Sequence, residues 1–429
     1  MQNKEFDLVV YGATSFVGQI LCRYLSSEHK EANFTWVMAA RSESKLQSLK
    51  DSLGTEASHI PLIVADSFDE AALRDLCERT EVLISTVGPY ALYGELLVKA
   101  CAETGTDYCD ITGESHWVKQ MISKYQDVAR ASGARIVNCC GFDSIPSDLG
   151  VKYLQQQAEA TFGQACNRVK MRVKASKGGP SGGTIASGVN LYKQAAKDPA
   201  LREELRDLYS MCPDGHGNEA KQHSVNAAEF DEDFDAWIGP FIMAGVNTRV
   251  VLRSNALGDN NYGAPFFYDE ATLAGEGDKG RKRAKKLASG SGLIMLVMVI
   301  PPLRWLATRF FLPRPGEGPS PQEQLEGFFD IRFHGCTDDG DEIRVKVTGD
   351  RDPGYGSTAK MLAQAAISLH RAVDKDAAEG GFWTPASIFG DDMQRRLESY
   401  AGFQFEVLET NPAAAQPASE QDAEAPVSQ

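Results

Sequence analysis

Short apolar runs alternate with amphipathic stretches along the first 150 residues, and this alternation restricts the possible folds more than any other feature. The runs lie at residues 7–11, 34–40, 61–65, 81–86, 108–111 and 134–139. Each run has the length of a buried strand, and the stretches between them have helical periodicity. Strands that alternate with helices form βαβ units with parallel strands. We therefore predict an α/β domain over 1–150 with six strands in a doubly wound parallel sheet.

The pattern changes after residue 150, which predicts a second domain of α+β type over 151–410. Turn residues at 337–341 separate two alternating runs at 328–334 and 342–348, which is typical of a β-hairpin. A helix is expected to follow from 357 to about 373. Residues 411–429 contain no aromatic side chain and are rich in Ala, Gln, Pro and Ser. We predict that they form a disordered tail.

Charge and cysteine usage exclude several classes of protein. The 44 Lys and Arg against 59 Asp and Glu give a net charge of −15, so we expect no nucleic-acid partner. The nine cysteines lack paired spacing and the seven histidines lack ligand spacing, so we expect neither a disulfide framework nor a metal site. The first ten residues leave no room for a signal peptide, and we expect a cytoplasmic protein.

The clearest chemical motif is the turn after the first strand, Gly12-Ala-Thr-Ser-Phe-Val-Gly18. Gly12 allows a tight turn, Gly18 allows close packing of helix on strand, and amides at the helix start can face a pyrophosphate. Ser15 replaces the middle glycine of the usual pattern. A Rossmann-type domain is thus predicted, although a turn of this kind can also bind nothing. The predicted contacts to the dinucleotide are Gly12, Thr14, Ser15, Phe16, Val17 and Gly18.

The second strand ends in Ala40-Arg41-Ser42, where an acid would accept the 2′-hydroxyl of NAD. Arg41 can instead bind a 2′-phosphate, with Ser42 and Lys45 assisting, so we predict NADP(H) as the cofactor. The alternative is that Arg41 is only a solvent-exposed loop residue and contacts no cofactor. Parallel strands end at one edge of the sheet, so the cofactor should also meet the ends of the later strands. These further predicted contacts are Asp66 beside the adenine and Thr86, Val87, Gly88 and Pro89 beside the nicotinamide.

Several longer segments have a combined order and spacing that suggest a family. They are AARS at 39–42, VGPY at 87–90, YCDITGE at 108–114, GFDSIPSD at 141–148, SGGT at 181–184, PGEGPS at 315–320, DPGYGS at 352–357 and GGFWTPA at 380–386. With the glycine turn, they make the chain resemble the saccharopine dehydrogenase-like oxidoreductases, most closely their trans-acting enoyl reductase branch. The resemblance implies an NADP-type Rossmann domain, a second domain facing the cofactor, and reduction of lipid-linked or polyketide-derived intermediates.

A reductase of this kind needs a proton donor near the carboxyl edge of the sheet, because the cofactor supplies the hydride. Tyr90, Tyr93 and Asp110 are the predicted catalytic residues, and Glu114 and Asp143 follow later strands at the same edge. Each also has a structural interpretation, as a packed tyrosine or as a carboxylate that caps a helix. The loop at 179–183 matches G-x-S-x-G of hydrolases, but we favour a flexible substrate-side loop that closes over the cofactor.

Six bases in the eight residues 279–286 precede an apolar run at 292–303. This run is too short to span a bilayer, and Pro301 and Pro302 interrupt it. Trp305, Phe310 and Phe311 extend the apolar character, so segment 279–312 is predicted to lie in the headgroup layer of a membrane. A buried helix or a dimer contact, preceded by a solvated basic loop, would give the same pattern.

These observations predict an NADP(H)-dependent oxidoreductase that reduces the enoyl C=C of an acyl or polyketide-derived intermediate in lipid or glycolipid biosynthesis. We expect a synthase partner, a homo-oligomer, and a cytoplasmic protein in peripheral contact with the inner face of a membrane or with lipid bodies. One alternative is a non-catalytic nucleotide-binding protein that associates with membranes or a partner. A second alternative is an amino-acid oxidoreductase like saccharopine dehydrogenase.

Overall fold

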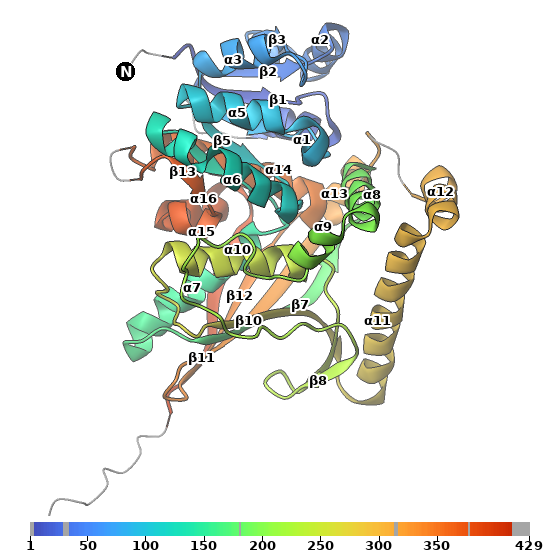
Figure 1. The fold of residues 1–429 in the computed structure, drawn as a ribbon, viewed down its shortest axis with the longest axis vertical. Helices are drawn as coiled ribbons and strands as arrows, with labels where there is room; N and C mark the ends of the chain where they lie inside the picture. Colours follow the sequence, from blue (N-terminus) through green and yellow to red (C-terminus); the bar gives the residue numbers. More distant parts are fainter. Residues whose placement is uncertain (1–3, 29–33, 180–181, 313–315, 376–377, 414–429) are drawn as a thin grey trace, which may run out of the picture.

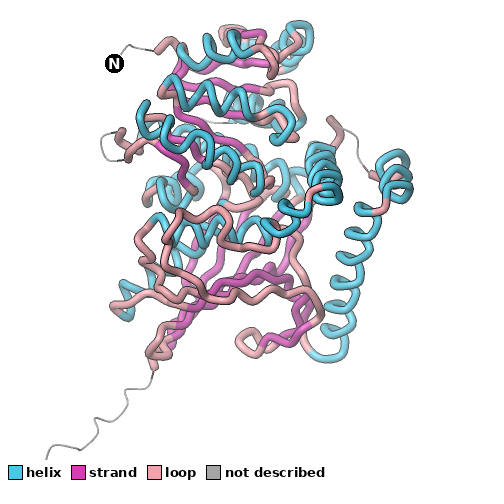
Figure 2. Tube along the Cα trace, in the orientation of Figure 1, coloured by secondary structure: helices cyan, strands magenta, loops and turns pink. Residues whose placement is uncertain are grey.

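The computed structural model describes residues 4–28, 34–179, 182–312, 316–375 and 378–413. These residues form two seven-stranded sheets. Figure 1 shows the first sheet at the top of the molecule and the second sheet below it, and Figure 2 shows helices around both. The long helix α11 (Gly277–Val299) and the short helix α12 (Pro301–Phe310) stand at one side of the molecule.

The first sheet is entirely parallel, in the order β13-β6-β5-β4-β1-β2-β3. Its strands are β1 (Phe6–Tyr11), β2 (Trp36–Ala40), β3 (Leu62–Val64), β4 (Thr80–Ser85), β5 (Asp107–Asp110), β6 (Arg135–Val137) and β13 (Gly381–Trp383). The chain crosses from one half of the sheet to the other between β3 and β4, so β1 pairs with both β2 and β4. This order is that of the doubly wound Rossmann fold, which confirms the predicted fold class.

Alternating residues of the strands bury the two faces of this sheet in separate cores. Leu8 and Val10 of β1 face the core that contains α1 and α14, whereas Val9 and Tyr11 face the core that contains α3, α5 and α6. The helices of the two faces are α1 (Phe16–Arg23), α14 (Thr358–Arg371), α3 (Glu70–Glu78), α5 (Glu95–Thr104) and α6 (Ser115–Ser132). Strands buried on both faces explain why the sequence runs are apolar throughout.

The second sheet is mixed, in the order β14-β12-β11-β7-β10-β9-β8, with only β7 and β10 parallel. Its strands are β7 (Arg168–Lys177), β8 (Glu229–Asp231), β9 (Ala236–Gly239), β10 (Phe267–Gly275), β11 (Phe328–Cys336), β12 (Glu342–Gly349) and β14 (Phe403–Asn411). The predicted hairpin is confirmed as β11 and β12. Helices α7 (Ile145–Phe162) and α10 (Ala244–Leu257) pack against this sheet.

Shorter elements connect these layers. The remaining helices are α2 (Glu43–Ser52), α4 (Tyr90–Tyr93), α8 (Gly182–Lys197), α9 (Pro199–Glu204), α13 (Pro321–Glu326), α15 (Pro385–Ile388) and α16 (Asp391–Tyr400). A 3-10 turn spans Thr55–Ala57, and π-helical turns span Tyr24–Glu28 and Pro353–Ser357. Within the described residues, no single helix is long and apolar enough to cross a membrane, and α11 with α12 meets that criterion only as a pair bent by 103°.

The two parts of the structure do not meet at residue 150, the predicted domain boundary. Residue 150 lies inside α7, and β13 and α14 return from the C-terminal part to complete the first sheet. Asn411, predicted to begin the tail, ends β14, because that strand pairs with β12 up to Glu342. The prediction of disorder at 414–429 lies outside the described residues.

Candidate functional site

The glycine turn lies at the carboxyl end of β1 and leads into α1. Gly12 has φ +85°, and a Cβ there would lie 2.6 Å from Val87 Cγ2. A Cβ on Gly18 would lie 2.2 Å from the carbonyl oxygen of Gly12. Both distances are shorter than a carbon atom tolerates, so the turn needs glycine at both positions for the reasons that the sequence suggests.

Two hydroxyl groups brace this turn. Ser15 Oγ accepts the amide of Gly18 at 2.9 Å and lies 2.9 Å from Thr86 Oγ1. Thr86, at the end of β4, is also 2.9 Å from the Gly12 carbonyl, to which it can donate. The hydroxyls therefore hold the turn in place. The first amides of α1, those of Phe16 and Val17, have no acceptor within the helix and can donate to a phosphate.

Arg41 lies directly after β2 with an exposed side chain that forms no ion pair within the described part of the chain. Ser42 caps α2 by accepting the Lys45 amide at 3.4 Å. A helix N-terminus beside a free guanidinium is a fitting site for the 2′-phosphate of NADP. Asp66 follows β3 at the same edge, and its carboxylate accepts the Phe68 amide at 3.0 Å.

The turn at 86–90, where the nicotinamide is expected, is held from two directions. The buried Glu114 carboxylate accepts the amides of Tyr90 at 2.8 Å and Ala91 at 3.1 Å. It also accepts the hydroxyl of Ser187 at 2.7 Å, and Ser187 belongs to α8. Helix α8 is thus fixed over the turn that contains Gly88 and the cis peptide to Pro89. Ser187 is not among the residues predicted from the sequence, because no local pattern relates it to residue 114.

Further segments from beyond residue 180 meet the glycine turn. The ring of Tyr355 packs edge to face on Phe16 at 5.1 Å, and its hydroxyl lies 3.4 Å from Thr184 Oγ1. The amide of Gly182 donates to the carbonyl of Glu317 at 3.1 Å. These contacts bring 182–187, 317–318 and 352–357 to the side of the cofactor site where a substrate would lie.

Tyr90 is placed in the core rather than at the site. Its hydroxyl donates to the carbonyl of Ser85 at 3.0 Å, and burial raises the pKa of this hydroxyl well above its ordinary value. A hydroxyl that is buried and already bonded is a poor proton donor, so Tyr90 is a structural residue. Tyr93 is partly buried on α4, with its ring 5.7 Å from that of Phe68.

Asp110 is also fully buried, at the end of β5. Its carboxylate accepts hydrogen bonds from Tyr108 Oη, Asn138 Nδ2 and the amides of Thr112 and Cys139, at 2.8 to 3.1 Å. Burial raises the pKa of Asp110 to about 6 against the opposing effect of these bonds. Four donors around one carboxylate organise the loops after β5 and β6, so Asp110 acts as a structural anchor.

Asp143, in the loop between β6 and α7, differs from Asp110. Its carboxylate is partly buried and forms no hydrogen bond within the described residues. Burial raises the pKa of Asp143 to about 6. Its Oδ2 lies against the backbone of Gly113, 3.1 Å from the position of a Cβ there, beside Glu114. Asp143 is therefore a carboxyl group without a hydrogen-bond partner among the described residues, at the edge of the sheet where the nicotinamide is predicted to lie.

The G-x-S-x-G segment cannot be placed, because Pro180 and Ser181 lie outside the described residues. Gly182 and Gly183 begin α8.

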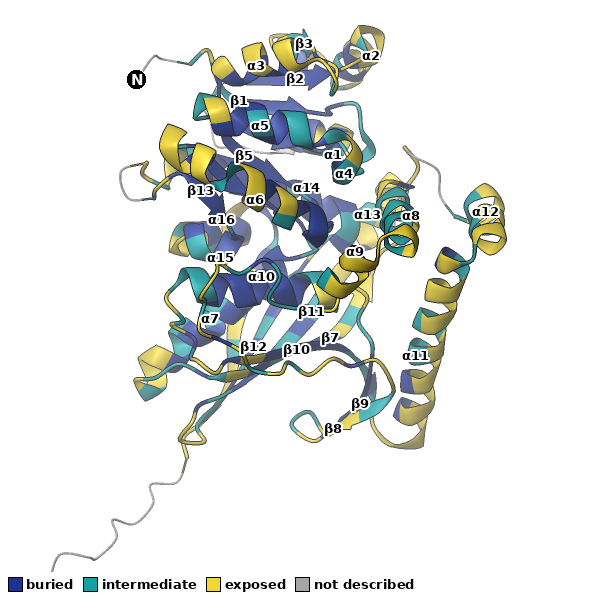
Figure 3. Cartoon of the chain, in the orientation of Figure 1, coloured by how far each residue is buried: buried dark blue, intermediate teal, exposed yellow. Residues whose placement is uncertain are grey.

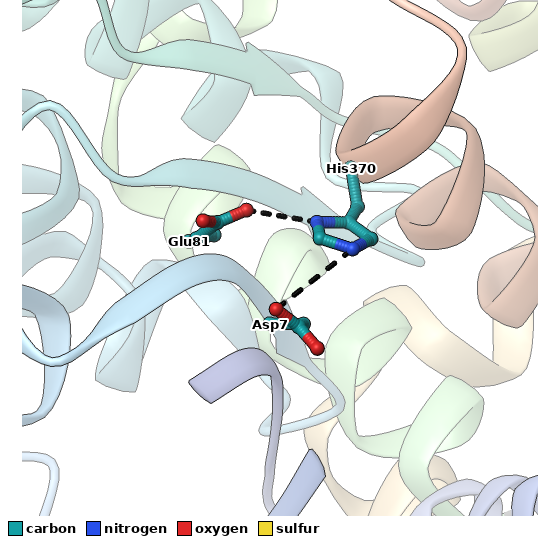
Figure 4. Close-up of side chains that lie close together, drawn as sticks. All are labelled: Asp7, Glu81 and His370. Atoms are coloured by element: carbon teal, nitrogen blue, oxygen red, sulfur yellow. Dashed lines mark hydrogen bonds and ion pairs between the residues drawn. The ribbon is translucent and has the colours of Figure 1, made fainter. Parts of the chain in front are cut away.

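One group of three metal-binding side chains, Asp7, Glu81 and His370, occurs within the described residues (Figure 4). The imidazole lies between the carboxylates, with Nδ1 2.8 Å from Glu81 and Nε2 3.8 Å from Asp7. The carboxylates therefore face opposite ring nitrogens, and together they clamp the imidazole through one hydrogen bond to Glu81 and one longer contact to Asp7. The clamp joins α14 to the amino ends of β1 and β4, at the edge opposite the glycine turn.

Residues 8–137 match the family model described as the saccharopine dehydrogenase NADP binding domain. A trans-acting enoyl reductase of Mycobacterium ulcerans is 33% identical over 414 residues, covering 92% of this chain and 96% of the relative. A trans-acting enoyl reductase of Mycobacterium tuberculosis is 34% identical over 413 residues, with the same coverage.

Among solved structures, apo saccharopine dehydrogenase (L-Glu forming) from Saccharomyces cerevisiae is similar with a TM-score of 0.52 and 12% identity, over 94% of this chain and 100% of the other. This similarity shows a common fold. The glycine turn, the doubly wound sheet and the full-length relatives agree with one another. The chain therefore belongs to the saccharopine dehydrogenase-like family of NADP-dependent oxidoreductases, together with the relatives called trans-acting enoyl reductases.

Proposed function

We propose that this protein reduces the C=C bond of an enoyl group in an acyl or polyketide-derived intermediate of lipid or glycolipid biosynthesis. The observation that carries the proposal is the hydrogen bond from Ser187 to Glu114, which fixes α8 over the nicotinamide edge. A helix from beyond the Rossmann-type segment then covers the face where an acceptor must lie. The names of the full-length relatives supply the reaction class.

NADPH, when bound, supplies a hydride to the β-carbon of the enoyl group. The chain must then deliver a proton to the α-carbon, which gives the saturated product. We assign this proton to Asp143, because its carboxyl group faces the same edge and is not used in a hydrogen bond. Glu114 and Ser187 act as positioning residues that fix helix α8 relative to the turn at Pro89.

The name of the relatives also suggests the partner. A trans-acting enzyme acts on an intermediate that another protein carries, so we infer that a separate synthase presents the substrate. We place the reaction in the cytoplasm, with segment 279–312 in contact with a lipid surface, as argued in the next subsection.

The test is turnover of NADPH with enoyl thioesters of increasing chain length, followed by absorbance and by mass analysis of the saturated product. We expect turnover with NADPH, much weaker turnover with NADH, and higher kcat/KM for longer chains. Saccharopine, glutamate and other amino acids serve as competing substrates. Turnover of an amino acid alone would favour the amino-acid oxidoreductase, and NADPH binding without any turnover would favour a non-catalytic nucleotide-binding protein.

A further inference from the structure

Large apolar side chains are exposed together on one part of the molecule. Of the 21 exposed large apolar residues in the described chain, ten lie between 293 and 311. They are Leu293, Ile294, Met295, Leu296, Val299, Leu303, Trp305, Leu306, Phe310 and Phe311. Soluble surfaces rarely concentrate apolar side chains in this way, so the cluster indicates a contact surface.

The geometry of α11 and α12 explains this exposure. The first half of α11 packs on the second sheet through Ala284, which is buried, and through Arg281, whose guanidinium lies 5.3 Å from the centre of the Trp237 ring. Residues 292–296 are all exposed, so the helix has left the body over more than a full turn. Helix α12 then bends away by 103° and has no buried residue. Figure 3 shows both helices largely exposed at the side of the molecule.

The same segment carries positive charge on an acidic chain. The six bases at 279–286 are exposed, and Arg304 and Arg309 lie on α12. Within the described residues, none of these eight cations pairs with a carboxylate. The chain as a whole has a net charge of −15. This segment therefore has a local excess of cations that only an external anion can neutralise.

We propose that α11 and α12 dock on the surface of a lipid layer that contains anionic headgroups. The aliphatic side chains of 293–306 enter the boundary of the acyl chains, and Trp305 and Phe310 lie at the level of the headgroups. The cations contact lipid phosphates. Two helices that meet at 103° define one plane, so both can lie along the surface without spanning it.

A second copy of this chain fits the same segment less well. A symmetric contact uses the same patch on both subunits. It would therefore bring two clusters of six unpaired cations into one interface, where like charges repel. A phosphate layer neutralises these charges instead. The docking inference goes beyond the proposed reaction and does not depend on it.

The test is flotation of the full chain with vesicles of phosphatidylcholine alone or mixed with phosphatidylglycerol, at low and high salt. We expect binding to the anionic vesicles that weakens at high salt. The triple variant K282Q/R283Q/K286Q should lower the affinity about 100-fold. The triple variant L293S/L296S/F310S should abolish binding at both low and high salt. Leu408→Ser, which removes an exposed apolar side chain on β14, is the matched control and should bind as the wild type does.

NADPH titration of each variant reports that the fold is intact, so loss of lipid binding and loss of the reaction can be told apart. The proposal is overturned if the wild type fails to float with anionic vesicles, or if both triple variants float as well as the control. It is also overturned if the apolar variant converts a dimer to a monomer while lipid binding is absent throughout, because the segment is then a subunit contact.

Discussion

We predict that a single side chain, that of Arg41, selects which dinucleotide this fold accepts. It stands where an acid would accept a 2′-hydroxyl, and its exposed guanidinium has no carboxylate partner in the described chain. The family match to an NADP binding domain agrees with this choice. The individual contacts to the cofactor stay predictions.

Arg41→Ala should weaken NADPH binding by about 10- to 100-fold, because one charge-assisted contact to the 2′-phosphate is lost. NADH binding should not change. Fluorescence titration with both nucleotides measures the ratio. The matched control is Arg23→Ala at the far end of α1, which should leave both affinities intact. Equal losses for NADPH and NADH would show that Arg41 does not contact this phosphate.

Asp143→Asn should lower kcat by at least about 100-fold and leave NADPH affinity unchanged, because the amide cannot supply the proton. The acid form is the active one, and its pKa is about 6, so wild-type kcat should fall as pH rises through about 6. A pH profile of kcat measures this, and the fall should be absent from the residual activity of the variant.

Asp110→Asn provides the contrast, because Asp110 has a similar pKa but four hydrogen-bond donors around it. This variant should lose thermal stability, while the enzyme that remains folded keeps the pH profile of the wild type. If instead Asp110→Asn removes the fall in kcat and Asp143→Asn keeps it, the two roles are reversed.

At the level of elements, α8 is held by one side-chain hydrogen bond to Glu114 at the nicotinamide edge. Ser187→Ala should raise KM for the enoyl substrate by about tenfold with little change in kcat, because the helix that covers the acceptor is less well positioned. Ser187→Thr keeps the hydroxyl and should restore KM. Steady-state kinetics at saturating NADPH distinguish these outcomes, and an unchanged KM in the alanine variant would argue against α8 as the cover.

Helix α14 is joined to the first sheet by a buried ion pair. Arg135 contacts Asp107 at 2.5 Å and donates to the carbonyls of Leu369 and Val373 at the end of α14. Both side chains of the pair are almost fully buried. Arg135→Ala removes the buried partner of Asp107 and leaves only the more exposed Lys375, 3.6 Å from this carboxylate. The substitution should lower the free energy of unfolding by about 3 kcal/mol.

Chemical denaturation measures this change. Lys99→Ala removes one side of an exposed pair with Glu70 and should cost less than about 1 kcal/mol. Similar losses for the two variants would mean that the buried pair does not fix α14.

At the level of the whole molecule, a buried polar cluster joins β10 of the second sheet to helix α10. Glu270 of β10 accepts Asn247 of α10 at 2.9 Å and Tyr268 at 2.7 Å, and burial raises the pKa of Glu270 from 4.5 to about 7. The folded state then binds this proton more tightly than the unfolded state. The stabilisation is complete below pH 4.5 and is lost as pH rises to about 7.

Glu270→Gln keeps the neutral form at every pH and should therefore reduce the fall in unfolding free energy over this range. Denaturation of both proteins between pH 5 and 8 measures the difference. Burial also raises the pKa of Asp148 to about 7, and this residue contributes equally to the pH dependence of both proteins. An identical pH dependence in the two proteins would contradict the assignment.

The sequence by itself determined the doubly wound sheet, the glycine turn and the cofactor class. These depend on local periodicity and on turn chemistry within a few residues, as at Gly12, Gly18 and Arg41. Tertiary packing decided the rest. It buried Tyr90 and Asp110, which sequence position alone placed at the edge, and it left the carboxyl group of Asp143 without a hydrogen bond. It also brought Ser187 to Glu114 across 73 residues and left residues 292–296 of α11 exposed. Such contacts join distant parts of the chain, so no local pattern encodes them.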